Sequence, residues 1–183
     1  PWIGQVRSIA QCWFCGSEAG NSIADVIFGK VNPSGKLPFT FPVRIEDSPA
    51  HALGAYTSEG RHYKESLYVG YRWFDTKGIR PPFAFGHGLS YTEFEYGEVN
   101  VSSKVSANGV LKASVKVKNI GSRYGKEIVQ LYIGEENPLL ERPTKELKAF
   151  EKVSLAPGET KTVKFEIPVS DLAYFNADTH SWV

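Results

Sequence analysis

The chain has 183 residues, of which 42% are hydrophobic and 22% charged, so it can bury a core and is not a disordered tail. Its 21 Lys and Arg nearly balance its 20 Asp and Glu, which argues against nucleic acid and anionic membranes as partners. No apolar stretch approaches the roughly 18 residues of a membrane span. The chain begins Pro1-Trp2-Ile3 and contains no methionine, so we expect a removed leader or a piece of a longer polypeptide.

Residues 8–15, SIAQCWFC, are a mostly apolar run of strand length that ends at Gly16-Ser17. The run holds the only two cysteines, Cys12 and Cys15, at a spacing typical of redox pairs and of half zinc sites. On an extended strand the two side chains point to opposite faces and lie too far apart for an easy disulfide. No second cysteine pair or spaced histidine pair completes a zinc site. Two packed thiols are therefore favoured, with redox and metal roles as alternatives.

Residues 17–30 predict a short helix, with Ser17 as the N-cap, Glu18 in the first turn and Gly29 as the stop. Three apolar residues at helical spacing supply its buried face: Ile23, Val26 and Ile27. The next strand candidate is 37–41, LPFTF, so strand, helix and strand suggest a βαβ unit of an α/β sheet. A carboxylate is stabilising at a helix N-terminus, so a capping or packing role is favoured for Glu18 over a catalytic one.

Residues 42–90 are irregular and rich in proline, glycine and aromatic residues. So many aromatic side chains favour an ordered connection packed on neighbouring structure over a flexible linker. Glu65 and Arg72 are candidates for an ion pair that braces this connection. Tyr71 and Trp73 are the candidates for a sugar-binding wall, although core packing is the commoner role of such residues.

From about residue 93 the apolar pattern has a period of two. In 110–119, VLKASVKVKN, apolar residues alternate with Lys and Ser, which predicts a half-buried strand. A slip of the apolar phase between Ala149 and Phe150 predicts a β-bulge. Three more strand candidates follow at short spacing: 126–134, 145–155 and 160–168. The predicted architecture is an all-β immunoglobulin or fibronectin type III-like sandwich.

Several stretches in order resemble the C-terminal end of family-three glycoside hydrolases, the β-glucosidase and β-xylosidase family. They are GSEAGNSIADVIFGKVNPSGKLPFTFP, KESLYVGYRWFD, PFAFGHGLSYTEFEY, KNIGSRYGKEIVQLYI, RPTKELKAFEKVSLAPGETKTVKFEI and DLAYF. The resemblance implies an α/β remnant over 1–92, namely the end of an α/β sandwich domain with the aromatic connecting segment. It implies a fibronectin type III-like domain over 93–183.

The resemblance implies an exo-acting β-glucosidase that hydrolyses terminal β-D-glucosyl residues by a retaining two-carboxylate mechanism. Members of this family carry an Asp nucleophile on an N-terminal barrel and a Glu acid/base on a loop of the α/β sandwich domain. Neither motif is found in this chain. The implied partners are a β-glucoside or oligosaccharide, bound through the full-length enzyme, and the missing barrel and acid/base loop of the same polypeptide. We expect this piece to be structural or supporting, and inactive alone.

Glu59 superficially matches the family's acid/base motif, but it follows the LPFTF stretch, where the catalytic glutamate is not expected. A solvated loop acid is its default role. The four histidines show no metal-binding spacing, and His87 between two glycines suggests a tight turn. The other three are His51, His62 and His180. We therefore predict no catalytic residue, no cofactor and no metal site in this chain.

The alternative function is a carbohydrate- or protein-binding fibronectin-like module without hydrolase activity, because a fold alone does not determine function. The expected immediate role of the sandwich in a full enzyme is to brace the α/β domain. One N-glycosylation sequon, Asn100-Val101-Ser102, slightly favours an extracellular over a cytoplasmic location.

Overall fold

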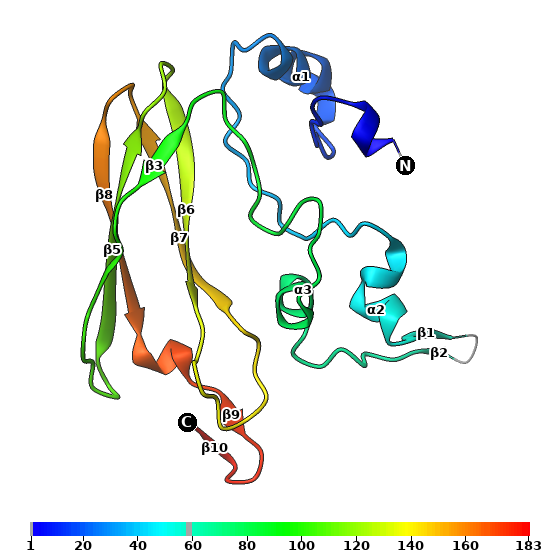
Figure 1. Cartoon of the computed structure of the whole chain (residues 1–183), viewed down its shortest axis with the longest axis vertical. Coiled ribbons are helices and arrows are strands. Elements are labelled where there is room, and N and C mark those ends of the chain that lie inside the picture. Colours follow the sequence, from blue (N-terminus) through cyan, green and yellow to red (C-terminus); the bar gives the residue numbers. More distant parts are fainter. Residues whose placement is uncertain (1, 58–59) are drawn as a thin grey trace.

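The computed structural model describes residues 2–57 and 60–183. Figure 1 shows a β-sandwich formed by β3 to β8, with a region of short helices and extended chain beside it. The hairpin β9–β10 lies at one end of the sandwich, and α3 lies between the sandwich and α2 (Figure 1). Within the described residues no helix is long and apolar enough to cross a membrane.

The region before the sandwich contains only short elements. The 3-10 helices η1 (Ile3–Gln5) and η2 (Gly16–Glu18) precede the helix α1 (Ala19–Ile27). The next elements are η3 (Ile45–Asp47), α2 (Pro49–Ala52), β1 (Tyr56–Thr57), β2 (Gly60–Arg61) and α3 (Tyr71–Lys77). β1 and β2 form an antiparallel hairpin.

The predicted helix forms as α1, but it begins later than expected. Ser17 is not its N-cap, because η2 occupies residues 16–18 and Glu18 takes the cap position without a side-chain bond to the backbone. The Glu18 carboxylate instead accepts a hydrogen bond from Asn21 Nδ2 at 2.6 Å. Gly29 ends the helix as predicted, at φ 70°, a left-handed conformation that glycine adopts without steric penalty. Ile27 remains 62% exposed, so described residues cover only part of the apolar face.

The predicted strands at 8–15 and 37–41 do not form, so the βαβ unit is wrong for the described residues. Residues 8–15 lack regular secondary structure and are mostly exposed. Residues 37–41 make only one isolated antiparallel bridge, between Phe41 and Phe83. A strand needs a neighbour that pairs with its N–H and C=O groups along its length. No described segment pairs with residues 8–15, and within 37–41 the backbone of residues 83–87 bonds only to that of Leu37 and Phe41, at the two ends of the segment.

The predicted ordered connection is confirmed around α3. Trp73 and Phe74 are only 7% and 4% exposed, whereas Tyr63 lies almost entirely in solvent. The end of the connection runs antiparallel beside residues 37–41. Backbone hydrogen bonds join Leu37 N–H to the His87 carbonyl at 2.8 Å and Phe41 N–H to the Phe83 carbonyl at 2.9 Å.

The sandwich consists of two antiparallel sheets. One contains β3 (Phe94–Tyr96), β4 (Asn100–Val101), β5 (Val110–Asn119) and β8 (Thr160–Pro168). The other contains β6 (Gly125–Ile133) and β7 (Glu146–Leu155). After β8 come η4 (Val169–Leu172), β9 (Phe175–Asn176) and β10 (Ser181–Trp182). β5 pairs along its length with β8 and, on its other edge, with β3 and β4 in turn.

The hydrophobic core lies between the two sheets. Ala113, Val115 and Val117 alternate inward along β5. The lysines at the alternate positions 112, 116 and 118 are exposed. The other members of the core are Val129, Leu155, Val163 and Phe165. Period-two alternation on both sheets buries one face of each, which is the arrangement of a β-sandwich. The sandwich prediction is therefore confirmed.

The predicted β-bulge in β7 exists, one residue earlier than expected. Leu131 pairs with Ala149 and Tyr132 pairs with Leu147, so Lys148 is the extra residue. A bulge leaves its extra residue outside the ladder and re-aims the neighbouring backbone. Directly beside it, the Leu147 N–H donates to the Tyr71 hydroxyl at 2.7 Å. The bulge thus lies where the sandwich meets α3.

Candidate functional site

Side chains from the region before the sandwich meet the β6–β7 sheet, the loop between these strands and Tyr124, which directly precedes β6. We call this contact surface the junction. Its polar and aromatic members are Asn32, Lys36, Tyr68, Tyr71, Arg72 and Asp75 on one side, and Tyr124, Glu127, Gln130, Tyr132, Glu141, Lys145 and Glu146 on the other. Nearly all of its polar contacts join residues far apart in the sequence. The junction is therefore a tertiary feature.

A paired carboxylate lies at the buried centre of the junction. Glu127 on β6 is only 8% exposed, and its Oε1 lies 3.0 Å from Lys36 Nζ. The Tyr96 hydroxyl donates to the same oxygen at 3.0 Å, and Lys36 also donates to the Gly88 carbonyl at 2.8 Å. Burial, together with the Glu127 charge, raises the pKa of Tyr96. A carboxylate this deeply buried is tolerated because the Lys36 cation and the Tyr96 hydroxyl replace the water molecules that would solvate it at the surface.

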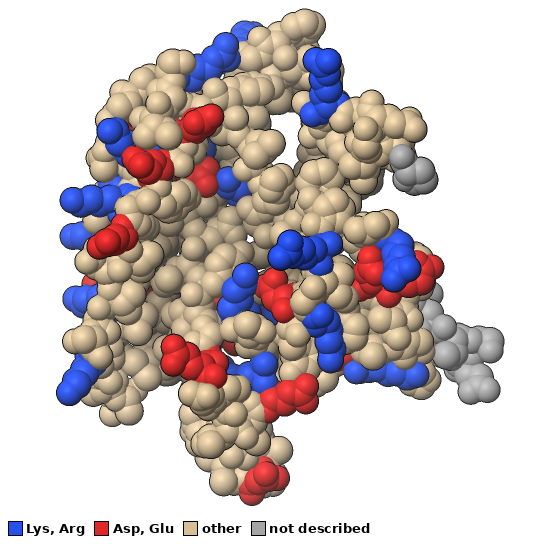
Figure 2. All heavy atoms as spheres, viewed as in Figure 1, with Lys and Arg blue, Asp and Glu red and all other residues tan. Residues whose placement is uncertain are grey.

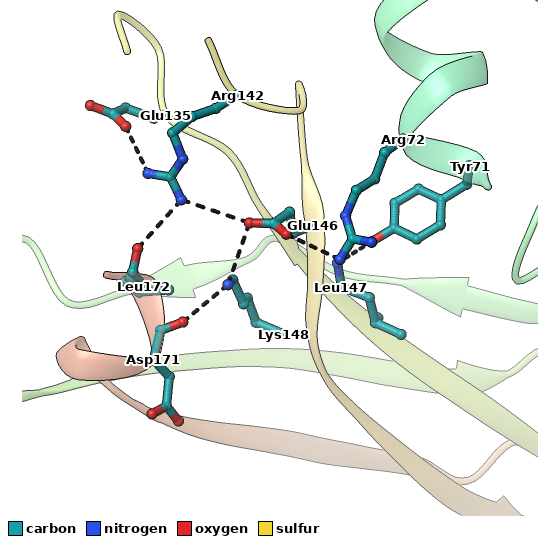
Figure 3. Close-up of polar contacts among 9 residues, drawn as sticks. All are labelled: Tyr71, Arg72, Glu135, Arg142, Glu146, Leu147, Lys148, Asp171 and Leu172. Carbon is teal, nitrogen blue, oxygen red and sulfur yellow. Dashed lines mark hydrogen bonds and ion pairs between the residues drawn. The ribbon is translucent and has the colours of Figure 1, made fainter. Parts of the chain in front are cut away.

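A second carboxylate, Glu146 at the start of β7, lies among three cations (Figure 3). Its Oε1 lies 3.1 Å from Arg72 Nη2, and its Oε2 lies 3.7 Å from Arg142 Nη2 and 3.5 Å from Lys148 Nζ. The predicted pair of Glu65 with Arg72 is therefore wrong, because α3 points Arg72 toward β7. Buried Glu65 Oε2 and Arg72 Nε have no hydrogen-bond partner among the described residues.

The Glu146 cluster extends to the C-terminal part of the sandwich (Figure 3). Arg142 binds Glu135 Oε2 at 2.9 Å, donates to the Leu172 carbonyl at 3.4 Å and lies 4.6 Å from the Tyr174 ring centre. Lys148 donates to the Asp171 carbonyl at 3.0 Å. Each cation thus has protein partners, which suits a brace between α3, β7 and η4 better than a site that holds an anion.

The two aromatic residues proposed for a sugar wall have packing contacts in this structure. Trp73 is buried, and its Nε1–H donates to the Asp47 carbonyl at 3.1 Å. The Tyr71 ring stacks on Phe85 with centres 4.7 Å apart and meets the Tyr132 ring edge-on at 5.8 Å. Tyr71 therefore holds α3 against the sandwich through both its ring and its hydroxyl.

A crevice of about 440 Å³ opens at the junction, with Tyr71, Phe85, Gln130 and Tyr132 among its lining residues. This volume is in the range of small-molecule sites. Its polar groups are engaged with one another, however. Gln130 Nε2 donates to the Gly86 carbonyl at 3.1 Å, and the Tyr132 hydroxyl donates to Gln130 Oε1 at 2.6 Å. These contacts make the crevice part of the joint between the two regions.

Alkaline pH should weaken this joint through Tyr132. Burial, followed by the nearby Tyr71 and Asp75, raises the pKa of Tyr132 to about 12. Because the pKa of Tyr132 in the folded chain exceeds its ordinary value of about 10, the protonated hydroxyl favours the folded state. This contribution to stability is complete below pH 10 and is lost as the pH rises through 12. We expect Tyr132→Phe to lose less stability than the wild type between pH 10 and 12, measured by urea unfolding. Tyr63→Phe, on an exposed tyrosine, should follow the wild type; equal losses in all three proteins would contradict the assignment.

The remaining sequence candidates do not form a site together. Glu59 lies outside the described residues. His87 lies in a tight turn as predicted, where its backbone N–H donates to the Ala84 carbonyl at 3.1 Å, but the residue is exposed and not packed as expected. Within the described ranges no group of three or more His, Cys, Asp or Glu is placed to hold a metal ion.

Both cysteines are free, but Cys12 is only half-buried and Cys15 is exposed, so the expectation of two packed thiols is wrong. Because the described residues form no sheet around 8–15, they leave both thiols at least partly open to solvent.

Sequence reasoning missed the polar residues that anchor the junction and the sandwich. The period-two pattern of β6 places Glu127 on the inward face with Val129, and that of β5 places Asn119 inward after Val117. A polar residue at an inward strand position is a detectable signal, because such a residue needs buried partners. The identity of Lys36 as partner of Glu127 has no comparable signal.

Charge is distributed without a dominant sign over the face shown in Figure 2, where Lys and Arg lie among Asp and Glu. This distribution agrees with the formal net charge of +1. The view shows no broad basic surface of the kind that binds polyanions.

Comparisons with known proteins agree with this architecture. The glycosyl hydrolase family 3 C-terminal domain matches residues 1–91, and the fibronectin type III-like domain matches residues 127–183. The chain therefore belongs to glycoside hydrolase family 3 and comprises a mixed α/β C-terminal region followed by a fibronectin type III-like sandwich. The family resemblance and the fold class expected from the sequence are confirmed.

The relatives are β-glucosidases. The chain is 50% identical to thermostable beta-glucosidase B of Acetivibrio thermocellus over 183 residues and 49% identical to beta-glucosidase BoGH3A of Bacteroides ovatus over 188. Each match covers all of this chain but only 24% and 25% of the relative. The crystal structure of DesR, a β-glucosidase from Streptomyces venezuelae in complex with D-glucose, matches with a TM-score of 0.91 at 37% identity. That match covers the whole chain and 24% of DesR. The chain thus spans about a quarter of the length of these relatives.

Proposed function

We propose that this chain is the supporting C-terminal part of an exo-acting β-glucosidase that removes terminal β-D-glucosyl residues with retention of configuration. The observation that carries the proposal is near-50% identity to β-glucosidases along the whole chain, although the chain spans only a quarter of their length. A retaining mechanism needs a nucleophile and an acid/base about 5–5.5 Å apart. We place both in other parts of the longer polypeptide, which also binds the β-glucoside or oligosaccharide.

Exposed apolar side chains near the N-terminus support this proposal. Trp13 is 51% exposed and Phe14 is fully exposed. Phe28, which directly follows α1, is 86% exposed. Trp2, Ile3 and Val6 add further exposed apolar surface. Large apolar side chains left exposed together in one short part of a chain are typical of a region that contacts another protein surface. In the proposed enzyme, the remainder of the α/β sandwich domain covers it.

The proposed role of the sandwich is to brace the α/β region through the junction. We place the boundary between the two units at 92/93, where Thr92 is buried and its hydroxyl donates to Asn119 Oδ1 at 2.7 Å. Because the chain is buried and hydrogen-bonded at Thr92, where it passes from one unit to the other, the two units are restricted in how they can move relative to each other. The paired carboxylates Glu127 and Glu146 would then fix their orientation.

The chain as given should not hydrolyse an aryl β-glucoside above background, whereas a longer polypeptide that includes this sequence should. The reason is that hydrolysis requires both carboxylates, which the proposal places elsewhere. The measurement is release of the aryl alcohol at equal molar concentrations of the two proteins. Glu59→Gln in the longer polypeptide serves as the matched control and should retain activity. Turnover by the chain alone, or loss of turnover in Glu59→Gln, would contradict the proposal.

A further inference from the structure

The two sheets of the sandwich are unequal in size. The first contains β3, β4, β5 and β8, whereas the described residues supply only β6 and β7 to the second. Immunoglobulin-type sandwiches pair a four-stranded sheet with a sheet of at least three strands, so that each inner face is covered. β7 packs against β8, and β6 lies toward β3, where the Tyr96 hydroxyl donates to Glu127 Oε1 at 3.0 Å. The edge of β6 that does not pair with β7 therefore lies on the side of β3 and β4.

This edge of β6 is free of backbone pairing. All nine residues of β6 pair with β7, and among the described residues no other backbone group bonds to the backbone of Gly125–Ile133. In an antiparallel sheet, alternate residues direct their N–H and C=O groups to opposite sides of the strand. Every second residue of β6 thus directs these groups away from β7. Such a row of unpaired groups is a template for a further strand.

The inner face of the first sheet is open along β3 and β4. Residues directly opposite each other in an antiparallel ladder point to the same face. Tyr96 on β3 pairs with Val117, which is 0% exposed. Val101 on β4 pairs with Ala113, which is 4% exposed. Tyr96 and Val101 therefore also face inward, yet they remain 46% and 53% exposed, because the described part of the second sheet does not extend over them.

We propose that the free edge of β6 binds a further β-strand, supplied by a part of the longer polypeptide outside this chain, which extends the second sheet and covers Tyr96 and Val101. The inference rests on the proposed function, since this chain covers only 24% and 25% of its relatives and the remainder can supply the strand. Backbone hydrogen bonds to β6 hold the strand, and apolar side chains at every second position face Tyr96 and Val101 and set its register. A strand of the same polypeptide is favoured over a second copy because it is present at a high effective concentration.

The test compares this chain with the longer polypeptide by the rate at which Val101→Cys reacts with N-ethylmaleimide. The reaction should be at least about tenfold slower in the longer polypeptide, because a covered side chain reacts only when the structure opens locally. Val110→Cys is the matched control. Val110 lies on β5, is 42% exposed and points to the opposite face from Ala113, so its rate should be equal in the two proteins. After trypsin digestion, positions 101 and 110 fall in the peptides 78–104 and 105–112, which contain no native cysteine.

Amide hydrogen exchange of β6 in the unmodified proteins is the second measurement. The amides at its free edge should exchange at least about tenfold more slowly in the longer polypeptide. Equal labelling of position 101 in the two proteins, or unchanged exchange over 125–133, would overturn the proposal. A dimer of this chain alone with position 101 already protected would also overturn it, because the bound strand would then come from a second copy.

Hydrolysis of an aryl β-glucoside by the longer polypeptide, measured in parallel, separates this inference from the proposed function. An active longer polypeptide with an unprotected position 101 would contradict the bound strand alone. An inactive one with position 101 and β6 protected would contradict the proposed hydrolase function and support the bound strand.

Discussion

Replacement of Lys36 by methionine should lower the free energy of unfolding by about 3 kcal/mol, because it leaves the Glu127 carboxylate buried without its cation. The Lys36 and Glu127 side chains are only 16% and 11% exposed, so water replaces the lost partner poorly. The replacement also removes the hydrogen bond from Lys36 Nζ to the Gly88 carbonyl. Methionine retains the unbranched, flexible apolar stem of the lysine, so the effect reports mainly on the charge.

Urea unfolding followed by circular dichroism measures this change. Lys112→Met is the matched control, since Lys112 pairs with Glu166 at 3.3 Å with both side chains about two-thirds exposed. That control should change stability by less than about 0.5 kcal/mol. The double variant Lys36→Met, Glu127→Gln should recover about 1–2 kcal/mol, because it removes the uncompensated charge. A loss in Lys36→Met no larger than in Lys112→Met would show that the pair does not stabilise the junction.

Asn119→Ala should also lower the free energy of unfolding by about 3 kcal/mol or more. Asn119 is completely buried, and its Oδ1 accepts hydrogen bonds from Thr92 Oγ1 at 2.7 Å and from Gly121 N–H at 3.1 Å. Its Nδ2 donates to the Arg123 carbonyl at 2.7 Å and to the Leu155 carbonyl at 3.0 Å. Alanine leaves these buried groups without partners, at about 1–3 kcal/mol each before the site relaxes.

The control for Asn119 is Asn100→Ala. Asn100 is exposed, and its side chain donates only to the Glu98 carbonyl at 3.4 Å. Its replacement should change the unfolding midpoint in urea by little, within about 0.5 kcal/mol. If Asn119→Ala were as mild as Asn100→Ala, buried water would have to replace the amide, and the link from Thr92 to the sandwich would carry little stability.

The two variants together test how the two regions are joined. Asn119 connects Thr92, at the boundary between the two units, to Leu155 at the end of β7 through hydrogen bonds. Lys36 connects the segment before the sandwich to β6 through its ion pair with Glu127. The two sets of contacts share no residue. Their effects on stability should therefore add, within about 0.5 kcal/mol, in the combined variant.

Strand content in the second half was predictable because local patterning and tertiary burial agree there. Residues 110–119 alternate apolar and polar side chains, and the same alternation appears as burial in β5. The bulge in β7 was also visible in the sequence, although it was placed one residue late, after Ala149 instead of at Lys148. Pairing with β6 sets the exact position, and a single strand does not contain this information.

The first half was less predictable because its apolar segments depend on neighbours. The run at 8–15 has strand composition, yet it lacks regular secondary structure, and Trp13 within it lies in the left-handed region. Composition signals that a segment can form a strand, but only a hydrogen-bonding partner makes it one. The same cause explains why Cys12 and Cys15 are not packed.

By itself, the sequence determined the family, the sandwich with its inward-facing residues and the end of α1 at Gly29. Each of these depends on residue order over a short span: a motif, a period of two or a glycine that accepts positive φ. Only the tertiary structure decided that Arg72 pairs with Glu146 instead of Glu65 and that Lys36 reaches Glu127. It also decided that CWFC does not form a strand. These features join residues distant in the chain or depend on missing strand partners, so no local pattern specifies them.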